Sequence, residues 1–478
     1  MKHHLIPAAS VVEVLPDAVV PDMAEMVKCK IAELEAKGSD DAFFICDVGD
    51  IIKKVTRWRE LLPNVAPFYA VKCNTDETVV KTLVDLGLGF DCASKGEIAQ
   101  VLKHGVSPSR IIYANPCKQK SFLKYAARHG VDLMTFDNEA ELIKIKELYP
   151  RARLVLRILP TLQVQVQCEL GNKFGCHPDN VLKLLSKAQE LDLDVMGISF
   201  HVGSGVEEAK AFSHAVQQAR DAWDLAVDLG FDMTLLDVGG GFPGQESAPV
   251  TFEEIAAVLN AALDYHFPKG CGAEIIAEPG RYFVASAFTL TCNIIAKRTV
   301  ARDVAHQDTL VVGSPDCYHK QALTKNDEPS YMYYLNDGLY GSFNSLMYDH
   351  AKVEPRVLND SPVSFTSSVW GPTCDGLDCI MQDCRLPEME VGQWMYFLDM
   401  GAYTMCAGST FNGMPRPDCF YVCEAELWSE LSPAEVCEKK RCSQIPPHLH
   451  TAQAAGEMQG AVGPISCCYP VDEELILL

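Results

Sequence analysis

The run that decides the fold reads Pro67-Phe68-Tyr69-Ala70-Val71-Lys72-Cys73-Asn74. It is apolar and partly aromatic up to Lys72 and polar near its end, which is typical of a buried strand that stops at an exposed edge. Seven more short runs of this kind follow before residue 285: Gly89–Cys92, Ile111–Ala114, Leu133–Phe136, Arg153–Ile158, Val195–Phe200, Thr234–Val238 and Glu274–Ala277. Stretches with apolar residues at spacings of three and four fill the gaps and predict helices. Eight alternations of strand and helix favour a closed parallel (β/α)8 barrel, with a doubly wound sheet as the alternative.

The chain changes character after about residue 285. Runs of alternating polarity, separated by Gly, Pro and Asp turns, predict a mostly antiparallel β domain. They are Ala287–Ile295, Thr309–Val312, Tyr331–Leu335, Ser364–Trp370 and Trp394–Asp399. We therefore expect residues 1–45 to join the β domain, 46–285 to form the barrel, 286–442 to form the C-terminal β domain and 443–478 to be a mobile tail.

Composition narrows the class of protein. The 478 residues include 41 basic and 64 acidic side chains, a net charge of −23, which disfavours nucleic acid and anionic membranes as partners. No stretch approaches 18 uninterrupted apolar residues, and Glu13, Pro16 and Asp17 interrupt the apolar N-terminal segment, so we expect a cytoplasmic protein. The 20 cysteines form no Cys-x-x-Cys pair and lack His partners at ligand spacing, which predicts free thiols and no metal site.

Polar residues follow the predicted strands at their carboxyl ends, where barrel enzymes build their sites. Lys72 closes the first strand, and partial burial there would lower its pKa, as a Schiff-base lysine requires. A lysine whose amine only reaches out to solvent is the plain alternative. His201 ends the sixth strand ahead of Gly-Ser-Gly, and its imidazole would either stack on a ligand or have a structural role.

Two glycine-rich turns follow the last two predicted strands. Gly239, Gly240 and Gly241 let backbone N–H groups approach an anion, and Glu278-Pro279-Gly280-Arg281 adds a second turn and a fixed positive charge. These loops are the usual phosphate site of a barrel. A lysine on the first strand and a phosphate cradle on the last two point to pyridoxal phosphate, with Glu278 placed to keep the pyridine nitrogen protonated. A salt bridge from Glu278 to Arg281 is the alternative.

Long blocks of the sequence resemble the eukaryotic ornithine decarboxylase family, pyridoxal-phosphate enzymes with a barrel and a β domain in the alanine racemase-like fold III. The resemblance covers about residues 40–425. It is carried by Pro67–Asn74, Phe90–Lys95, Asn115–Gln119, Phe200–Gly205, Leu236–Gly244, Ala277–Arg281, Asn336–His350, Trp370–Asp378 and Met400–Thr404. It implies that the chain converts an L-amino acid into its amine and carbon dioxide.

The resemblance also implies a role for each matched residue around the cofactor. Lys72 would hold the cofactor as a Schiff base, Glu278 would pair with the pyridine nitrogen, and His201 would stack on the ring. Asp91 and Arg157 would support the lysine side of the site. The phosphate would be held by residues from four parts of the chain: Ser204, Gly239, Gly240, Gly241, Gly280, Arg281 and Tyr403.

The implied substrate residues come from the second domain. Cys374 would return a proton to the carbanion after carbon dioxide leaves. Asp375, with Asp349 of a partner subunit, would grip the distal ammonium of a diamino acid. Tyr340 and Phe411 fall in blocks that match the family's subunit interface and line its substrate site. The resemblance therefore implies a head-to-tail homodimer with shared active sites.

One departure leaves the substrate open. After Arg157 the family usually continues with small and acidic residues, whereas residues 159–167 here read Leu-Pro-Thr-Leu-Gln-Val-Gln-Val-Gln. L-Ornithine, which yields putrescine for polyamine synthesis, is the default substrate. The less acidic loop favours drift toward a neutral aliphatic amino acid such as leucine.

An antizyme inhibitor and a racemase are the alternatives to the decarboxylase. Antizyme inhibitors keep the fold, lose cofactor residues and bind the regulator antizyme. This sequence keeps the cofactor positions, but Lys120–Ile143 matches the family's antizyme-binding region, so antizyme stays open as a partner. A racemase on the same barrel usually places an arginine against the pyridine nitrogen, which Glu278 disfavours.

Overall fold

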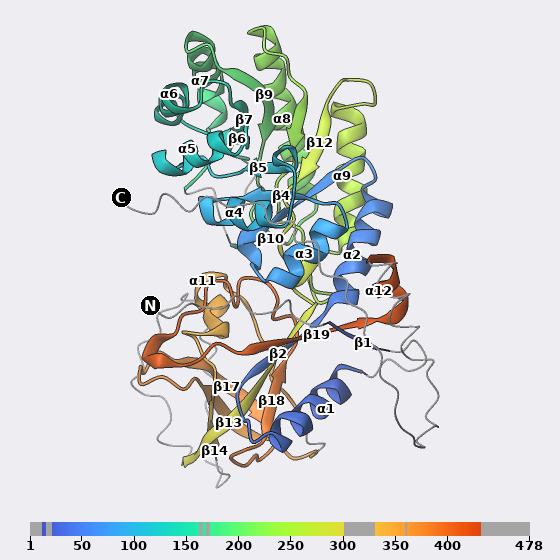
Figure 1. The fold of residues 1–478 in the computed structure, drawn as a ribbon, viewed down its shortest axis with the longest axis vertical. Coiled ribbons are helices and arrows are strands. Elements are labelled where there is room, and N and C mark those ends of the chain that lie inside the picture. The colour runs from blue at the N-terminus through green and yellow to red at the C-terminus, as the bar shows by residue number, and fades with distance from the viewer. Residues whose placement is uncertain are drawn as a thin grey trace, which may run out of the picture. The chain divides into compact units, whose positions relative to one another are not determined.

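The computed structural model describes residues 12–15, 22–161, 166–168, 173–300, 330–358 and 361–431. Eight parallel strands of these residues close into a barrel, which confirms the predicted (β/α)8 architecture. The barrel strands are β3 (Ala66–Ala70), β4 (Gly89–Cys92), β5 (Ile111–Tyr113), β6 (Leu133–Phe136), β7 (Arg153–Arg157), β9 (Asp194–Ser199), β11 (Leu235–Asp237) and β12 (Glu274–Ala277). Figure 1 shows them surrounded by α2 (Val48–Leu61), α3 (Glu77–Asp85), α4 (Lys95–Lys103), α5 (Lys120–Arg128), α6 (Glu139–Leu148), α7 (Pro178–Glu190), α8 (Lys210–Asp228) and α9 (Phe252–His266).

Packed side chains fill the inside of the barrel. One buried cluster draws on five strands and the residue that follows β5: Ile112, Ala114, Leu133, Val155, Leu235 and Ile276. Gly197 makes room for it, because a Cβ at this position would lie 2.6 Å from the carbonyl oxygen of Leu235. The interior is a core and not a channel, which leaves the carboxyl ends of the strands for a ligand.

Nine strands of the described residues form a second, mostly antiparallel sheet, as predicted. They are β1 (Val12–Leu15), β2 (Phe43–Asp47), β13 (Phe288–Val300), β14 (Ser330–Leu335), β15 (Arg356–Val357), β16 (Phe365–Trp370), β17 (Cys379–Leu386), β18 (Trp394–Phe397) and β19 (Asp418–Glu424). The pairs β1–β19, β19–β2 and β14–β16 are parallel. Val27 and Ile31 of α1 (Met23–Ala36) pack on this sheet. The predicted strand Thr309–Val312 and the tail 443–478 lie outside the described residues.

Short elements complete the description of the chain. They are η2 (Pro108–Arg110), α10 (Arg281–Val284), η4 (Ser342–Asn344), α11 (Ser345–Tyr348), η5 (Phe411–Gly413) and α12 (Ala425–Leu431). An aromatic cluster holds α10 against the barrel helices. The ring of Trp58 on α2 lies 5.4 Å from that of Tyr282 and 5.3 Å from that of Phe252, and its Nε1 donates to the carbonyl of Val65. This packing fixes the helix that begins at Arg281.

The structure corrects the end of the first predicted strand. β3 stops at Ala70, and Val71–Cys73 form a single 3-10 turn, η1, that carries Lys72. The hydroxyl of Tyr69 donates to the carbonyl of Asn74 at 2.9 Å and closes this turn. Apolar residues suit both a buried strand and a buried turn, so the pattern alone did not separate the two.

A small hairpin was also not predicted. Strand β8 (Val166–Cys168), from the loop that departs from the family pattern, pairs with β10 (Ser204–Val206). Gly203 and Gly205 have φ of +110° and +62°, and a Cβ on them would lie 2.8 Å from Val166 and 2.9 Å from Gln167. Glycine therefore suits both positions. The close approach of the two strands brings Gln167 to the carboxyl end of the barrel, beside Gly205.

Candidate active site

A small cavity opens at the carboxyl ends of the barrel strands. Nine residues predicted for the site line it: Lys72, His201, Ser204, Gly240, Gly241, Glu278, Gly280, Arg281 and Tyr403. Ala70 and Phe242 complete the lining. The residues come from four strand ends of the barrel and from one loop of the sheet domain, so the fold brings together positions more than 300 apart in sequence.

Lys72 is held by a buried carboxylate. Its Nζ donates to Oδ2 of Asp91, and the Asp91 side chain is fully buried at the end of β4. Burial alone would lower the pKa of Lys72, but the charges of Asp91 and Glu278 outweigh it and raise the pKa above its ordinary value. The expected lowered pKa is therefore wrong. The sequence pattern did not reveal that the carboxyl groups of Asp91 and Glu278 both act on this amine.

Two carboxyl groups of the site lie next to each other. Asp237 ends β11, Glu278 follows β12, and both are buried. Burial raises the pKa of Asp237 to about 7, and burial together with the charge of Asp237 raises that of Glu278 well above its ordinary value. The positive charge of Arg157 acts against both shifts. The Arg157 side chain stacks on Phe174, with 5.3 Å between the guanidinium carbon and the ring centre.

The glycine turn has no room for side chains. A Cβ on Gly239 would lie 2.0 Å from the carbonyl oxygen of Phe200, and one on Gly240 would lie 2.8 Å from Nε2 of His201 and from the carbonyl oxygen of Glu278. Burial and the nearby Arg157 charge lower the pKa of His201 well below its ordinary value, so the imidazole is neutral. Its Nδ1 accepts from the N–H of Gly203 at 3.1 Å.

Arg281 supplies a buried positive charge opposite this turn. Its Nη2 donates to the hydroxyl of Ser204 at 2.7 Å and to Oδ1 of Asp349 at 2.8 Å. Its Nε has no hydrogen-bond partner within the described part of the chain. The guanidinium lies over the ring of Tyr403, 5.2 Å from the ring centre, and Tyr403 itself has a left-handed φ of 57°. A buried guanidinium with a free donor beside a glycine turn is the arrangement expected of an anion site.

The carboxylate of Asp349 is held within its own chain, and its expected pairing with Asp375 across two subunits stays a prediction. It accepts from Nη2 of Arg281. Nε2 of Gln167 also donates to Oδ2 of Asp349 at 2.9 Å and to its backbone carbonyl at 2.7 Å. The carboxylate is therefore surrounded by donors from its own subunit.

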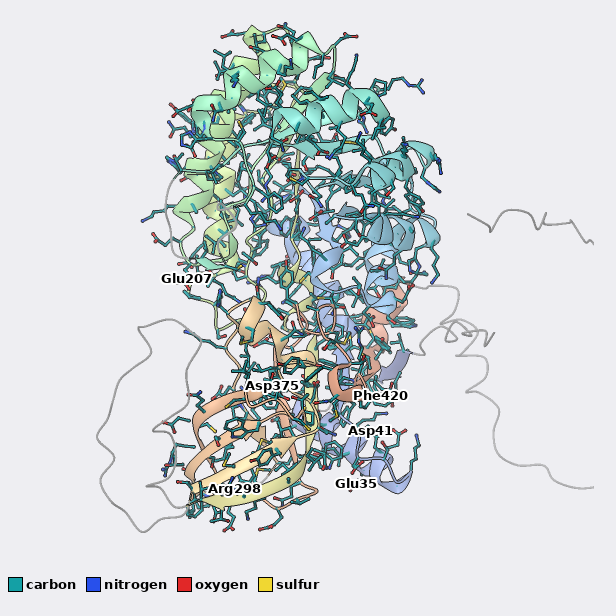
Figure 2. All side chains as sticks on the ribbon, turned by 90° about the vertical axis from the view of Figure 1, so that its left-hand side faces the viewer. Glu35, Asp41, Glu207, Arg298, Asp375 and Phe420 are labelled. Atoms are coloured by element: carbon teal, nitrogen blue, oxygen red, sulfur yellow. The ribbon has the colours of Figure 1, made fainter. Side chains whose placement is uncertain are left out.

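Four predicted residues lie apart from the cavity. Cys374 and Asp375 stand in the loop between β16 and β17, in the sheet domain where Figure 2 labels Asp375. The thiol of Cys374 is exposed, and the carboxylate of Asp375 accepts from the hydroxyl of Tyr340. The rings of Tyr340 and Phe411 pack with centres 4.6 Å apart. These four form a second cluster, and none of them lines the cavity of their own chain.

Two residues of the site were not predicted from the sequence. Asp237 is the polar end of the apolar run Leu235–Asp237, directly before the three glycines, and this signal was available. Gln167 lies in a stretch without periodicity, and its place depends on the hairpin with β10, so no local signal marks it.

Comparison with known proteins gives the class. Residues 48–285 match the family model described as "Pyridoxal-dependent decarboxylase, pyridoxal binding domain". The solved structure of the Paramecium bursaria Chlorella virus arginine decarboxylase bound to agmatine superposes with a TM-score of 0.74 at 34% identity, over 84% of this chain and 100% of that one. The lysine/ornithine decarboxylase of Vibrio vulnificus complexed with putrescine has a TM-score of 0.71 at 27% identity, over 86% and 100%. The fold and site thus define a pyridoxal-phosphate-dependent carboxy-lyase.

Sequence relatives narrow the class to a family. The chain is 51% identical to ornithine decarboxylase of Rattus norvegicus over 403 residues, 84% of either chain. It is 44% identical to antizyme inhibitor 2 of Xenopus laevis over 458 residues, 95% of this chain and 93% of the relative. The chain belongs to the ornithine decarboxylase family of amino-acid decarboxylases.

The residues in the cavity fit pyridoxal phosphate. A lysine amine suits its aldehyde, a buried carboxyl suits its ring nitrogen, and a glycine turn with the free Nε of Arg281 suits its phosphate. Among the described residues, no group of three His, Cys, Asp or Glu side chains is arranged to bind a metal. Within the same residues, no helix has the length and apolarity to span a membrane.

The glycine turn yields a prediction. Gly240→Ala places a methyl group 2.8 Å from both His201 and Glu278, so it should weaken pyridoxal phosphate binding by at least about tenfold while the fold persists. A titration of the purified protein with cofactor, followed by visible absorbance, measures this. Gly96→Ala on α4 is the matched control, because its methyl group meets only Ser94 at 3.7 Å. Unchanged affinity of Gly240→Ala would remove this turn from the cofactor site.

Proposed function

We propose that the chain decarboxylates an L-amino acid in this cavity, with Lys72 as the cofactor-binding amine. One observation supports the proposal most strongly: Lys72, Glu278 and Arg281 line the same cavity. Each supplies a different part of what pyridoxal phosphate needs: an amine, a proton-binding carboxyl and a phosphate-binding cation. When bound, pyridoxal phosphate supplies an electron sink for the electrons left at Cα when carbon dioxide departs.

The other lining residues take supporting roles in this proposal. His201 is neutral and partly buried, and its imidazole would stack against the cofactor ring. Asp91 holds the Lys72 amine in place through a partly buried ion pair, and Arg157 balances the carboxyl groups on this side. Side chains and backbone groups from four parts of the chain would hold the phosphate: Ser204, Gly239, Gly240, Gly241, Gly280, Arg281 and Tyr403.

We further propose that a second copy of the chain completes the site. Cys374 is the proton donor to Cα, yet it is exposed and does not line the cavity of its own chain. Around it lie exposed apolar side chains, with Leu377 at 54% and Phe411 at 45% exposure. Such a patch favours contact with another subunit, and a head-to-tail homodimer would carry the cluster of Cys374, Asp375, Tyr340 and Phe411 to the cavity of the partner.

L-Ornithine is the first candidate substrate. The rat relative at 51% identity is an ornithine decarboxylase, and the two carboxylates expected to grip a distal ammonium, Asp349 and Asp375, are both present. An ornithine-decarboxylating chain would supply putrescine for polyamine synthesis.

A neutral aliphatic amino acid such as leucine is the second candidate. The specific observation is that the amide of Gln167 donates to the carboxylate of Asp349, which Arg281 also contacts. Donors that already surround a carboxylate reduce its attraction for a substrate ammonium. The uncharged residues 159–167 point the same way.

Antizyme binding belongs to the alternative function. The 44% identity with a frog antizyme inhibitor 2 supports it, and α5 exposes the basic side chains of Lys120, Lys124 and Arg128. The complete set of cavity residues supports the enzyme instead. A chain that serves only as an antizyme inhibitor would release no carbon dioxide from any amino acid.

Mixing inactive variants tests the shared site. Lys72→Ala and Cys374→Ala should each lose nearly all activity as pure proteins. Random exchange of their subunits makes half of the dimers mixed, and one of the two sites in each mixed dimer carries no substitution. About a quarter of wild-type activity should therefore return. No recovery after proven subunit exchange would contradict a site built from two chains.

Carbon dioxide release from ornithine, lysine, arginine and leucine identifies the substrate. The expected result is turnover of ornithine or leucine that Lys72→Ala abolishes. The Gln167→Ala variant removes one of the two donor side chains from Asp349, so it should raise kcat/KM for ornithine relative to leucine by about tenfold.

Gln217→Ala is the matched control, since Gln217 is an exposed glutamine on α8 outside the site. An unchanged ratio in Gln167→Ala would remove Gln167 from substrate selection. Exclusive turnover of ornithine by the wild type would reject the neutral substrate.

A further inference from the structure

Asp237 and Glu278 are two carboxyl groups locked into contact by the backbone. Their strands pair in parallel, with Asp237 opposite Ile276. The N–H of Glu278 donates to the carbonyl of Gly239 at 2.7 Å, and the N–H of Gly239 donates to Oδ1 of Asp237 at 2.9 Å. Oδ1 of Asp237 is thus occupied by the Gly239 N–H, and the side chains of Asp237 and Glu278 lie within hydrogen-bonding reach of each other.

The contact requires a proton. Oδ2 of Asp237 is buried and meets no donor among the described residues. The amine of Lys72 is paired with Asp91, so it does not bridge the two carboxyl groups. Two buried carboxylates in contact cannot both ionise, and they therefore share one proton.

We infer that Asp237 is a positioning residue that carries this proton and donates it from Oδ2 to Glu278, so that Glu278 stays an ionised acceptor for the cofactor nitrogen. The inference rests on the proposed function of Glu278. It is distinct from the roles proposed above, because Asp237 does not line the cavity.

The proton belongs on Asp237 and not on Glu278 once the cofactor is bound. A protonated pyridine nitrogen needs an anionic acceptor, and Glu278 is the member of the pair that faces the cavity. A neutral Asp237 adds no second buried negative charge and fixes the rotamer of Glu278 by a hydrogen bond. Nothing else among the described residues donates to Oδ2 of Asp237, and a proton on this oxygen satisfies its contact with Glu278.

Isosteric variants test the inference. Asp237→Asn keeps an acceptor for Gly239 and a permanent donor toward Glu278, whereas Asp237→Leu keeps the size and loses both. Cofactor affinity, titrated by absorbance without substrate, should stay within about threefold of wild type for Asp237→Asn and fall by about tenfold or more for Asp237→Leu. The infrared difference spectrum of wild-type holoenzyme minus Asp237→Asn should contain the carbonyl stretch of a neutral carboxyl group.

The outcomes distinguish a failure of the role inferred for Asp237 from a failure of the proposed function. Loss of affinity in Asp237→Asn, or only carboxylate bands in the difference spectrum, would show that Asp237 acts as an anion and would overturn the inference. Wild-type affinity in Asp237→Leu would also overturn it. If Asp237→Leu does not fold, Asp237→Asn and its spectrum still decide. Failure of the wild type itself to bind the cofactor would instead overturn the proposed function on which the inference rests.

Discussion

Pairing between β12 and β3 closes the barrel, and the site depends on this closure. The ladder joins Ile276 to Ala66 and Ala277 to Pro67, the last strand to the first. Because both strands run in the same direction, the residues that follow them emerge at one end. Lys72, carried by the turn after β3, therefore meets Glu278 and Gly280, which follow β12 some 200 residues later. The packed interior below leaves this end as the place for a ligand.

Charge balance is the second constraint on the site. A largely buried region brings three cationic side chains together with four carboxyl groups. The cations are Lys72, Arg157 and Arg281, and the carboxyl groups are those of Asp91, Asp237, Glu278 and Asp349. Lys72 is paired with Asp91 and Arg281 with Asp349. Both cations are thus held where an aldehyde and a phosphate would arrive, and the carboxyl groups keep them from being buried without a partner.

Much of this was predictable from sequence because it is local. The eight apolar runs, the glycine turn at Gly239–Gly241 and the acid at Glu278 follow from periodicity and position, and the structure places them as predicted. Three features were not predictable, because each depends on a contact between distant segments. The 3-10 turn at Lys72 is closed by Tyr69 and Asn74, the raised pKa of Lys72 comes from acids on β4 and after β12, and Gln167 reaches Asp349 only through the β8–β10 hairpin.

The proposed function depends above all on Lys72 as the residue that binds the cofactor. Reduction of the cofactor-loaded protein with borohydride, followed by digestion and mass spectrometry, tests this role, because reduction makes a lysine–cofactor bond permanent. We expect one phosphopyridoxyl group per chain, located on Lys72 and absent from Lys72→Ala. A label on another lysine, or a loaded wild type that takes up no label, would contradict it.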